Sequence, residues 1–275
     1  MRAIESAVAT SVVVINLERK MKVSIITVCF NSEKTIEDTI KSVQSQTYTN
    51  IEYIVIDGKS NDYTNEIVSK YKDVVKLHVS EPDNGLYDAM NKGIKLANGD
   101  IIGILNSDDV LADEYVIEKI IAGFEDKSVD AVYSDLIYVS EYDLNKATRL
   151  YSSKIFSKRM IKFGIMLPHP TFYVRKKCYE KEGLYKTNYR VAADFELLAR
   201  FMSNGIKSIR LPFISVKMRE GGISSSGLLW RVHQNFEIVR ACRENGIYTN
   251  IFFVMLKLPY KLLTLLTRWF IPVAK

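Results

Sequence analysis

The sequence predicts an α/β protein in which a mostly parallel sheet is flanked by helices, and three observations predict it. Apolar, strand-like runs alternate with stretches whose apolar residues recur at helical spacing. The first run, residues 23–30, is almost continuously apolar, which is typical of a strand covered on both faces. Polar clusters directly follow three of the runs, as expected where a ligand binds beyond the carboxyl ends of parallel strands.

The elements after the first strand follow from capping residues and apolar spacing. Asn31 and Ser32 supply capping side chains ahead of a helix. Further strands are predicted over residues 51–56, 74–79 and 101–105. The helices between the strands are indicated by three sets of apolar residues, which are Ile36, Ile40 and Val43, then Ile67, Val68 and Tyr71, then Leu86, Met90, Ile94 and Ala97.

Composition is that of a folded protein with a basic surface. The 275 residues are 47% hydrophobic and 25% charged, which excludes disorder except at the ends. A net charge of +6 suits a phosphorylated substrate, an anionic membrane surface or nucleic acid. No stretch interleaves basic and aromatic residues, which argues against nucleic acid as a partner. The three cysteines, Cys29, Cys178 and Cys242, are scattered in apolar or helical surroundings and are predicted to be core thiols in a reducing compartment.

Two adjacent acids, Asp108 and Asp109, follow the strand predicted at 101–105. Neighbouring carboxylates repel each other and are costly to desolvate, so a divalent cation is the usual means of neutralising them. Mg²⁺ and Mn²⁺ take oxygen ligands and commonly bridge carboxylates to a diphosphate. The alternative is that the pair caps a helix starting near Asp113. Polar clusters at the other strand ends favour the metal.

The cluster after the second strand begins with Asp57 and Gly58. A carboxylate at this position is placed to bond a base or ribose, and glycine allows close approach of the backbone. The alternative is a simple turn in which Asn61 or Asp62 caps the next helix. Further along the chain, Asp88 and Lys92 are one helical turn apart, and the alternative there is an exposed ion pair.

Four motifs together resemble the family 2 glycosyltransferases: SIITVCFN at 24–31, IDGKSNDYT at 56–64, DNGLYDAMNKG at 83–93 and LNSDD at 105–109. The resemblance runs in order from about residue 22 to residue 227. It implies a Rossmann-like GT-A fold, a nucleotide-sugar donor and inversion at the anomeric centre. The chain looks most like the bacterial branch that builds O-antigen, capsule and exopolysaccharide repeats.

The same resemblance implies roles at the donor site. Residues 27–31 would line the nucleotide pocket, Asp57 would hold the base and Asp88 would lie close to the nucleotide. Residues 106–108 fall on the Asp-any-Asp motif, so Asp108, with Asp109, would bind Mg²⁺ or Mn²⁺. The first acid of the motif is Asn106 here, which predicts a weaker metal affinity. The expected nucleotide-sugar-binding residues are Thr27, Cys29, Asn31, Asp57, Ser60, Asp88, Lys92, Asn106, Ser107 and Arg219.

Asp194, at the start of a predicted helix, matches the family's general base, which takes the proton from the acceptor hydroxyl. The alternative is a helix cap. Glu196 is a second candidate at the acceptor. His169 is expected to line the acceptor pocket or to be a structural imidazole. Arg219 begins a glycine loop that resembles the family's C-terminal lid, where it would act as a countercharge to the diphosphate.

The tail differs in character from the rest of the chain. Residues 228–242 predict an amphipathic helix, and residues 251–270 are strongly apolar but interrupted by Lys257, Lys261 and Arg268. This pattern favours a helix that lies in a membrane interface, with packing against the catalytic domain or a second subunit as the alternative. No uncharged run reaches 18 residues, so no ordinary membrane span is predicted.

These features predict three segments. Residues 1–20 are an N-terminal extension without the charge pattern of a secretory signal. Residues 21–227 are a GT-A catalytic domain, with a nucleotide-sugar-binding half at 21–112 and an acceptor-binding half at 113–227. Residues 228–275 are amphipathic helices associated with the membrane.

The predicted function is metal-dependent, inverting sugar transfer to a hydroxyl of a lipid-linked glycan, on the cytoplasmic face of a bacterial inner membrane. A nucleotidyltransferase is one alternative, although residues 27–34 are not the glycine- and lysine-rich phosphate loop it would usually need. The other is a non-catalytic nucleotide-sugar-binding protein, which would have no need of Asp194.

Overall fold

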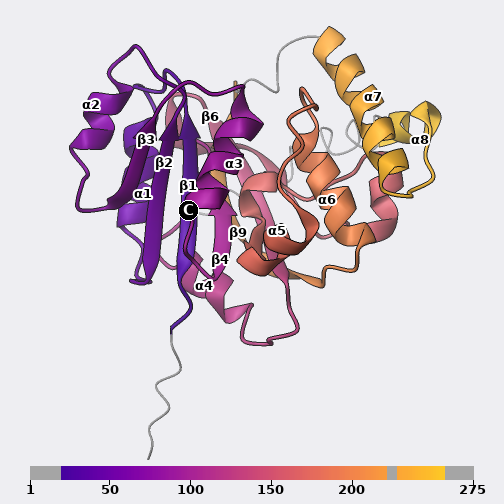
Figure 1. Cartoon of the computed structure of the whole chain (residues 1–275), viewed down its shortest axis with the longest axis horizontal. Helices are drawn as coiled ribbons and strands as arrows, with labels where there is room; N and C mark the ends of the chain where they lie inside the picture. The colour runs from indigo at the N-terminus through magenta and orange to yellow at the C-terminus, as the bar shows by residue number, and fades with distance from the viewer. Residues whose placement is uncertain (1–19, 222–227, 258–275) are drawn as a thin grey trace, which may run out of the picture.

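The structure is a computed structural model that describes residues 20–221 and 228–257, and in this part of the chain nine strands form one sheet (Figure 1). The strand order is β3-β2-β1-β4-β8-β6-β9-β5, and β7 pairs with the far end of β6. The strands are β1 (Val23–Cys29), β2 (Ile51–Asp57), β3 (Val75–Ser80), β4 (Ile101–Ile104), β5 (Asp109–Leu111), β6 (Ala131–Ser140), β7 (Asp143–Tyr151), β8 (Tyr173–Arg175) and β9 (Ser208–Arg219).

The predicted α/β class is confirmed, and the sheet is parallel where the sequence alternates most regularly. Strands β1 to β4 pair in parallel. The second half is mixed, because β8 runs antiparallel to both β4 and β6, and β6 and β7 form a hairpin. The boundary predicted at residue 112 falls directly after β5, which pairs with β9 from the second half. The two predicted halves therefore share one sheet.

Helices cover both faces of the sheet and define two cores. One core joins the sheet to α1 (Ile36–Gln44), α2 (Thr64–Ser69) and α4 (Val116–Ala122). The other joins the opposite face to α3 (Leu86–Leu96), α5 (Lys176–Glu182), α6 (Ala193–Ser203) and α7 (Leu228–Glu244). Alternate residues of β1 divide between the cores, with Ile25 in the first and Ile26 in the second. All three cysteines are buried and free, as predicted.

Short elements complete the chain. Two 3₁₀ helices, η1 (Lys158–Phe163) and η2 (His169–Thr171), precede β8, and α8 (Ile251–Met255) follows α7. Figure 1 shows α7 and α8 beyond α6, at the far end of the molecule from α1 and α2. The described residues contain no helix long and apolar enough to cross a membrane. Residues 1–19, 222–227 and 258–275 lie outside the described part, and with them most of the predicted extension and of the apolar tail.

Gly103 allows β4 and β8 to pack closely. It pairs with Tyr173, and a Cβ at Gly103 would lie 2.2 Å from Cε1 of that fully buried ring. We expect Gly103→Ala to lower the free energy of unfolding by about 2–3 kcal/mol, because the ring has no room to move. Urea unfolding measures the loss. Tyr173→Phe is the matched control, since it keeps the ring and removes a hydroxyl without a hydrogen-bond partner among the described residues. Equal stability of Gly103→Ala and wild type would contradict this account.

Candidate active site

Polar clusters at the ends of β1, β2 and β4 contact one another, as the parallel topology predicts. Cys29 pairs with Asp57 in the β1–β2 ladder, so the two strands end at the same level. The backbone N–H of Asn31 donates to Oγ of Ser60 at 2.8 Å, and the Asn31 side chain accepts from the Asn61 N–H. Oγ of Ser32 lies 2.9 Å from Oγ of Ser107, which joins this pair of loops to the acid loop after β4.

Asp57 is a fully buried carboxylate that holds its own loop closed. It accepts hydrogen bonds from the Ser60 N–H and hydroxyl, from Nδ2 of Asn65 at 2.9 Å and from Oγ of Ser80 at 2.6 Å. Burial alone would raise the pKa of Asp57, but these hydrogen bonds outweigh it and lower the pKa below its usual value. Asp57 is therefore ionised at neutral pH and fixes the shape of the predicted base pocket.

The side chains around Asp57 differ in what they can offer a ligand. Thr27 is fully buried and accepts a hydrogen bond from Tyr53, and Cys29 is buried with its thiol against Asp57. Burial raises the pKa of the Cys29 thiol, so it stays protonated. The buried side chains of Thr27 and Cys29 thus support the loops of the site from the protein core. Phe30, which falls within the range 27–31 predicted to line the nucleotide pocket, has 62% of its surface exposed and lies beside Gly58.

The ion pair between Asp88 and Lys92, which was the alternative interpretation of these two residues, is present. Nζ of Lys92 lies 3.9 Å from Asp88 and 3.0 Å from Glu81. Lys92 also donates to the Pro82 carbonyl at 2.7 Å, and Asp88 accepts from the Asn84 N–H. These bonds shape the loop that leads into α3. A role for Asp88 and Lys92 at the nucleotide stays a prediction.

The acid loop at 106–109 does not cap a helix. Asp109 lies in β5, and α4 begins seven residues later, at Val116. Nδ2 of Asn106 donates to Oδ2 of Asp109 at 2.9 Å, whereas Oδ1 of Asp109 is buried without a hydrogen-bond partner in the described part of the chain. Burial raises the pKa of both Asp108 and Asp109, and the charge of Asp108 raises that of Asp109 further.

These acids fit a divalent cation. An acid pair whose carboxyl groups resist ionisation, with one buried oxygen unpartnered, is an arrangement that a hard cation would stabilise through oxygen ligands. Asp108, which is partly exposed, and Asp109 are the side chains that would hold the ion. Within residues 20–221 and 228–257 no group of three or more His, Cys, Asp or Glu side chains is arranged to hold a metal. For an ion held by these two acids, substrate oxygens and water would supply the other ligands.

Arg219 anchors the acid loop in this structure. Its Nη1 donates to the Asp108 carbonyl at 2.8 Å and its Nη2 contacts Asp38 of α1 at 2.5 Å. The guanidinium is buried between these partners. Its predicted contact with the diphosphate stays a prediction, and the observed contacts give it a second task in positioning Asp108.

Asp194 lies in the first turn of α6 and is partly exposed. It is not the helix cap, because the N-cap residue is Ala192. Oδ1 of Asp194 accepts from the Phe195 N–H at 2.8 Å and from the Tyr87 hydroxyl at 3.5 Å. Burial raises the pKa of Asp194, and the nearby His169 offsets part of that rise. A carboxylate with a raised pKa is a stronger base than an ordinary surface aspartate, provided it remains ionised.

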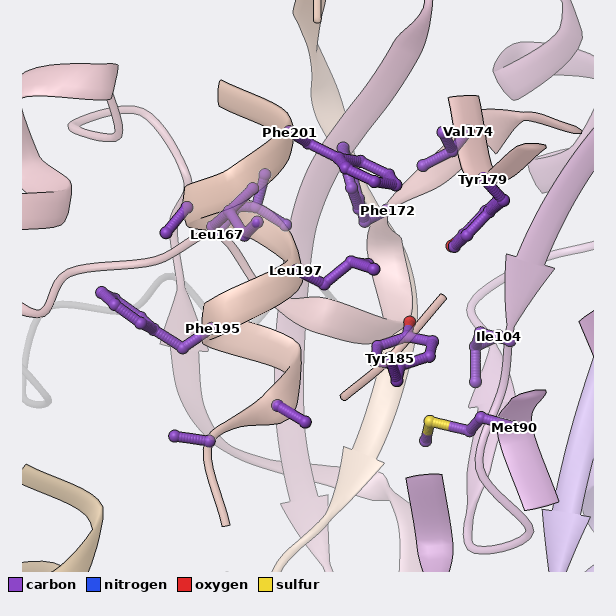
Figure 2. Packing of buried hydrophobic residues seen from close by; sticks show 14 of the residues in the cluster. Met90, Ile104, Leu167, Phe172, Val174, Tyr179, Tyr185, Phe195, Leu197 and Phe201 are labelled. Atoms are coloured by element: carbon purple, nitrogen blue, oxygen red, sulfur yellow. The ribbon is translucent and has the colours of Figure 1, made fainter. Parts of the chain in front are cut away.

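Aromatic residues that the sequence analysis did not identify surround Asp194. Tyr87 stacks on Tyr185 with ring centroids 5.8 Å apart, and the Tyr185 hydroxyl is 2.7 Å from Nε2 of His169. Figure 2 shows Tyr185 among apolar side chains of the core that α3, α5, α6 and α7 share, near Leu197 of α6. Burial lowers the pKa of His169, so its imidazole is neutral at neutral pH. Both open interpretations of His169 fit this contact, since it braces the cluster beside Asp194.

Glu196 does not fit the acceptor-binding role proposed for it. The side chain is fully buried, and its carboxylate binds Arg200 at 3.0 Å and Lys186 at 2.8 Å. Asn245 of the segment after α7 donates to the same carboxylate at 3.2 Å. These partners occupy its two oxygens, so Glu196 ties α6 to its neighbours. Its position two residues after Asp194 turns it to a different side of the helix.

The fold is that of the GT-A glycosyltransferases. The model of glycosyl transferase family 2 matches residues 24–183, and the chain belongs to this family. This membership sets aside the nucleotidyltransferase alternative.

Relatives and solved structures agree with the family. An uncharacterized glycosyltransferase of Mycobacterium tuberculosis is 33% identical over 180 residues, which cover 65% of this chain and 68% of the relative. A PGL/p-HBAD biosynthesis glycosyltransferase of Mycobacterium bovis is 27% identical over 74% of this chain and 79% of its own length. S. aureus TarS 1-349 in complex with UDP-GlcNAc superposes with a TM-score of 0.66 at 18% identity, over 91% of this chain and 73% of that one. A mannosyltransferase from Pyrobaculum calidifontis in complex with GDP-Man and Mn²⁺ gives 0.64 at 17% identity, over 91% and 74%.

Proposed function

We propose that this glycosyltransferase moves a sugar, with inversion, from a nucleoside diphosphate sugar to a hydroxyl group, and that Asp194 is the general base. The observation that carries the proposal is the carboxylate of Asp194, partly exposed in a mainly apolar and aromatic setting that raises its pKa. A non-catalytic binding protein would gain nothing from this costly burial.

The donor would bind along the carboxyl ends of β1, β2 and β4. The exposed ring of Phe30 offers a stacking surface for the base, beside a loop that Asp57 holds rigid. Asp108 and Asp109 would hold Mg²⁺ or Mn²⁺. The cation, when bound, supplies positive charge that favours departure of the nucleoside diphosphate. Two solved structures of this fold contain UDP-GlcNAc and GDP-Man, so nucleotide sugars of both kinds are the first candidates.

Transfer then depends on one proton movement by this chain. Asp194 accepts the proton of the acceptor hydroxyl while the hydroxyl oxygen attacks the anomeric carbon from the face opposite the leaving group. The bond to the diphosphate breaks as the new glycosidic bond forms, so the configuration inverts. The Tyr87 hydroxyl, which donates to the Val191 carbonyl at 2.6 Å and lies 3.5 Å from Oδ1 of Asp194, would help to orient this carboxylate. His169 contacts the Tyr185 hydroxyl at 2.7 Å and braces the aromatic side chains beside Asp194.

A panel of UDP-glucose, UDP-GlcNAc and GDP-mannose with Mn²⁺ tests the function. We expect at least one donor to raise the melting temperature and to release its nucleoside diphosphate through transfer or slow hydrolysis. Stabilisation without any release, including with extracts containing lipid-linked glycans, would favour the non-catalytic alternative.

We also propose that the acceptor is a lipid-linked glycan met at the cytoplasmic face of a bacterial membrane. Six large apolar side chains are exposed on α7 and α8, between them and directly after α8, and these are Val232, Phe236, Tyr248, Phe252, Met255 and Leu256. Asn235 contacts Met255, so the two helices adjoin. Exposed Arg231, Arg240 and Arg243 lie on α7 and suit an anionic leaflet.

Phe252, whose side chain is 79% exposed, provides the test of membrane contact. We expect Phe252→Asp to weaken sedimentation with phosphatidylglycerol vesicles about tenfold or more, because one buried Phe contributes about 2 kcal/mol and a carboxylate is repelled. Tyr142→Asp is the matched control, since Tyr142 is at least as exposed as Phe252 but lies at the β6–β7 turn. If both variants sediment like wild type, or if wild type does not sediment at all, this surface is not the membrane contact.

A further inference from the structure

One carboxylate joins α7 to the loop in front of α6. Glu237 is only 7% exposed, and its oxygens accept three consecutive backbone N–H groups. The distances are 2.7 Å to Arg190, 2.8 Å to Val191 and 2.8 Å to Ala192. Charge-assisted bonds of this kind are about twice as strong as neutral ones. The three bonds therefore fix the backbone of residues 190–192 from a helix that lies more than forty positions further along the chain.

The same loop is held from its other side by the donor half. The hydroxyl of Tyr87, on α3, donates to the Val191 carbonyl at 2.6 Å. Ala192 is the N-cap of α6, and Asp194 follows it by two residues. The loop is thus bound on one side by Glu237 of α7 and on the other by Tyr87 of α3. It leads directly into the first turn of α6, where Asp194, the proposed base, lies.

We propose that Glu237 is a positioning residue that sets the place of Asp194 for proton transfer. The inference rests on the proposed function, because it assigns Glu237 a task in that reaction. A buried carboxylate is costly, and an apolar side chain at this position would leave three N–H groups unpaired. Proton transfer requires the base within hydrogen-bond reach of its substrate, and an error of about 1 Å can slow an enzyme about 100-fold. The donor-binding strands make none of these contacts, so Glu237 acts on turnover and not on donor affinity.

The test is Glu237→Gln in the full chain, with the nucleotide sugar that gives turnover in the panel above. The amide keeps one oxygen as an acceptor but places its NH₂ group, a donor, where the other carboxylate oxygen accepted from the backbone. We expect kcat to fall about 10- to 100-fold while the donor KM changes less than about twofold. Hydrogen exchange of the 190–192 amides should become faster. Glu237→Asp, which keeps the charge but is one methylene shorter, should lose kcat in the same way and covers the case in which Glu237→Gln does not fold.

Glu244→Gln is the matched control on the same helix. Among the described residues, Glu244 binds Lys186, Tyr189 and Arg240 and has no hydrogen bond to residues 190–192, so the kcat of this variant should stay near wild type. In an Asp194→Asn background, Glu237→Gln should cause no further loss, since there is no base left to position. Unchanged kcat in both Glu237 variants, or an equal loss in that background, would overturn the inference. A wild-type protein without turnover, or an active Asp194→Asn variant, would instead overturn the proposed function or its base.

Discussion

Asp194→Asn should remain folded and bind its donor, yet turn over about 10²–10⁴-fold more slowly, which is the usual contribution of a general base. The amide keeps the shape of the side chain and the bond from Phe195 N–H but cannot take the acceptor proton. Because Asp194 does not lie among the residues that would hold the nucleotide or the cation, the donor KM and the effect of Mn²⁺ should be nearly unchanged. Steady-state kinetics of nucleotide release measure both quantities.

The pH dependence adds a second readout. Burial raises the folded-state pKa of Asp194 above its unfolded value, so kcat should fall as acidification protonates this carboxylate. The same shift means that ionisation of Asp194 destabilises the folded protein. The stability that protonated Asp194 provides is fully present below its unfolded-state pKa and is lost as the pH rises through its folded-state pKa. Asp194→Asn should therefore be at least as stable as wild type at neutral pH. Asp143→Asn, in the exposed hairpin strand β7, is the control. High activity in Asp194→Asn would assign the base role to another group.

Removing the cation should have the other large effect. Excess EDTA should abolish transfer, and Asp108→Ala should weaken Mn²⁺ binding by more than ~100-fold, because it removes the partly exposed acid of the pair. Mn²⁺ titrations followed by thermal unfolding, with UDP present, give a readout apart from activity. Asp113→Ala, an exposed acid paired with Lys119, is the matched control and should bind as wild type does.

The raised pKa values of Asp108 and Asp109 fix how this binding varies with pH. Their ionisation in the folded protein is opposed by burial, so without a cation their contribution to stability declines as pH rises through the folded pKa values. A cation that binds the ionised pair reverses this decline. The rise in melting temperature caused by Mn²⁺ should therefore grow from acidic to neutral pH. Full activity in excess EDTA, or a Mn²⁺ effect that does not change with pH, would contradict the metal assignment.

Much of the donor side could be predicted from the sequence, for a physical reason. Residues 23–29 and 51–57 are apolar strands, and parallel strands bring their carboxyl ends to one edge. Asn31, Asp57 and Ser107 therefore had to fall close together, and the hydrogen bonds among their loops confirm the proximity. The antiparallel β8 was not predicted, because its three residues are too short for a period to identify.

On the predicted acceptor side, the sequence could predict Asp194 but not the residues that contact it. The position of Asp194 at a helix start was visible in the sequence, but its neighbours Tyr87 and Tyr185 come from elements about ten to one hundred residues away. Helical spacing can indicate the i,i+4 pair of Glu196 with Arg200. It cannot tell that Glu196 also pairs with Lys186, or that Arg219 pairs with Asp38, because only folding brings these side chains together.

The sequence by itself determined the α/β class, the edge at which the donor would bind and the acids available for chemistry, because hydrophobic period and strand ends are local properties of a chain. Only the tertiary structure decided which carboxylates are held in buried contacts and which keep partial exposure. Glu196 and Glu237 are both buried and hydrogen-bonded, whereas Asp194 and Asp108 keep partial exposure and raised pKa values. The reason is that the charge state and the task of a carboxylate depend on its burial and partners, which residues distant in the chain provide.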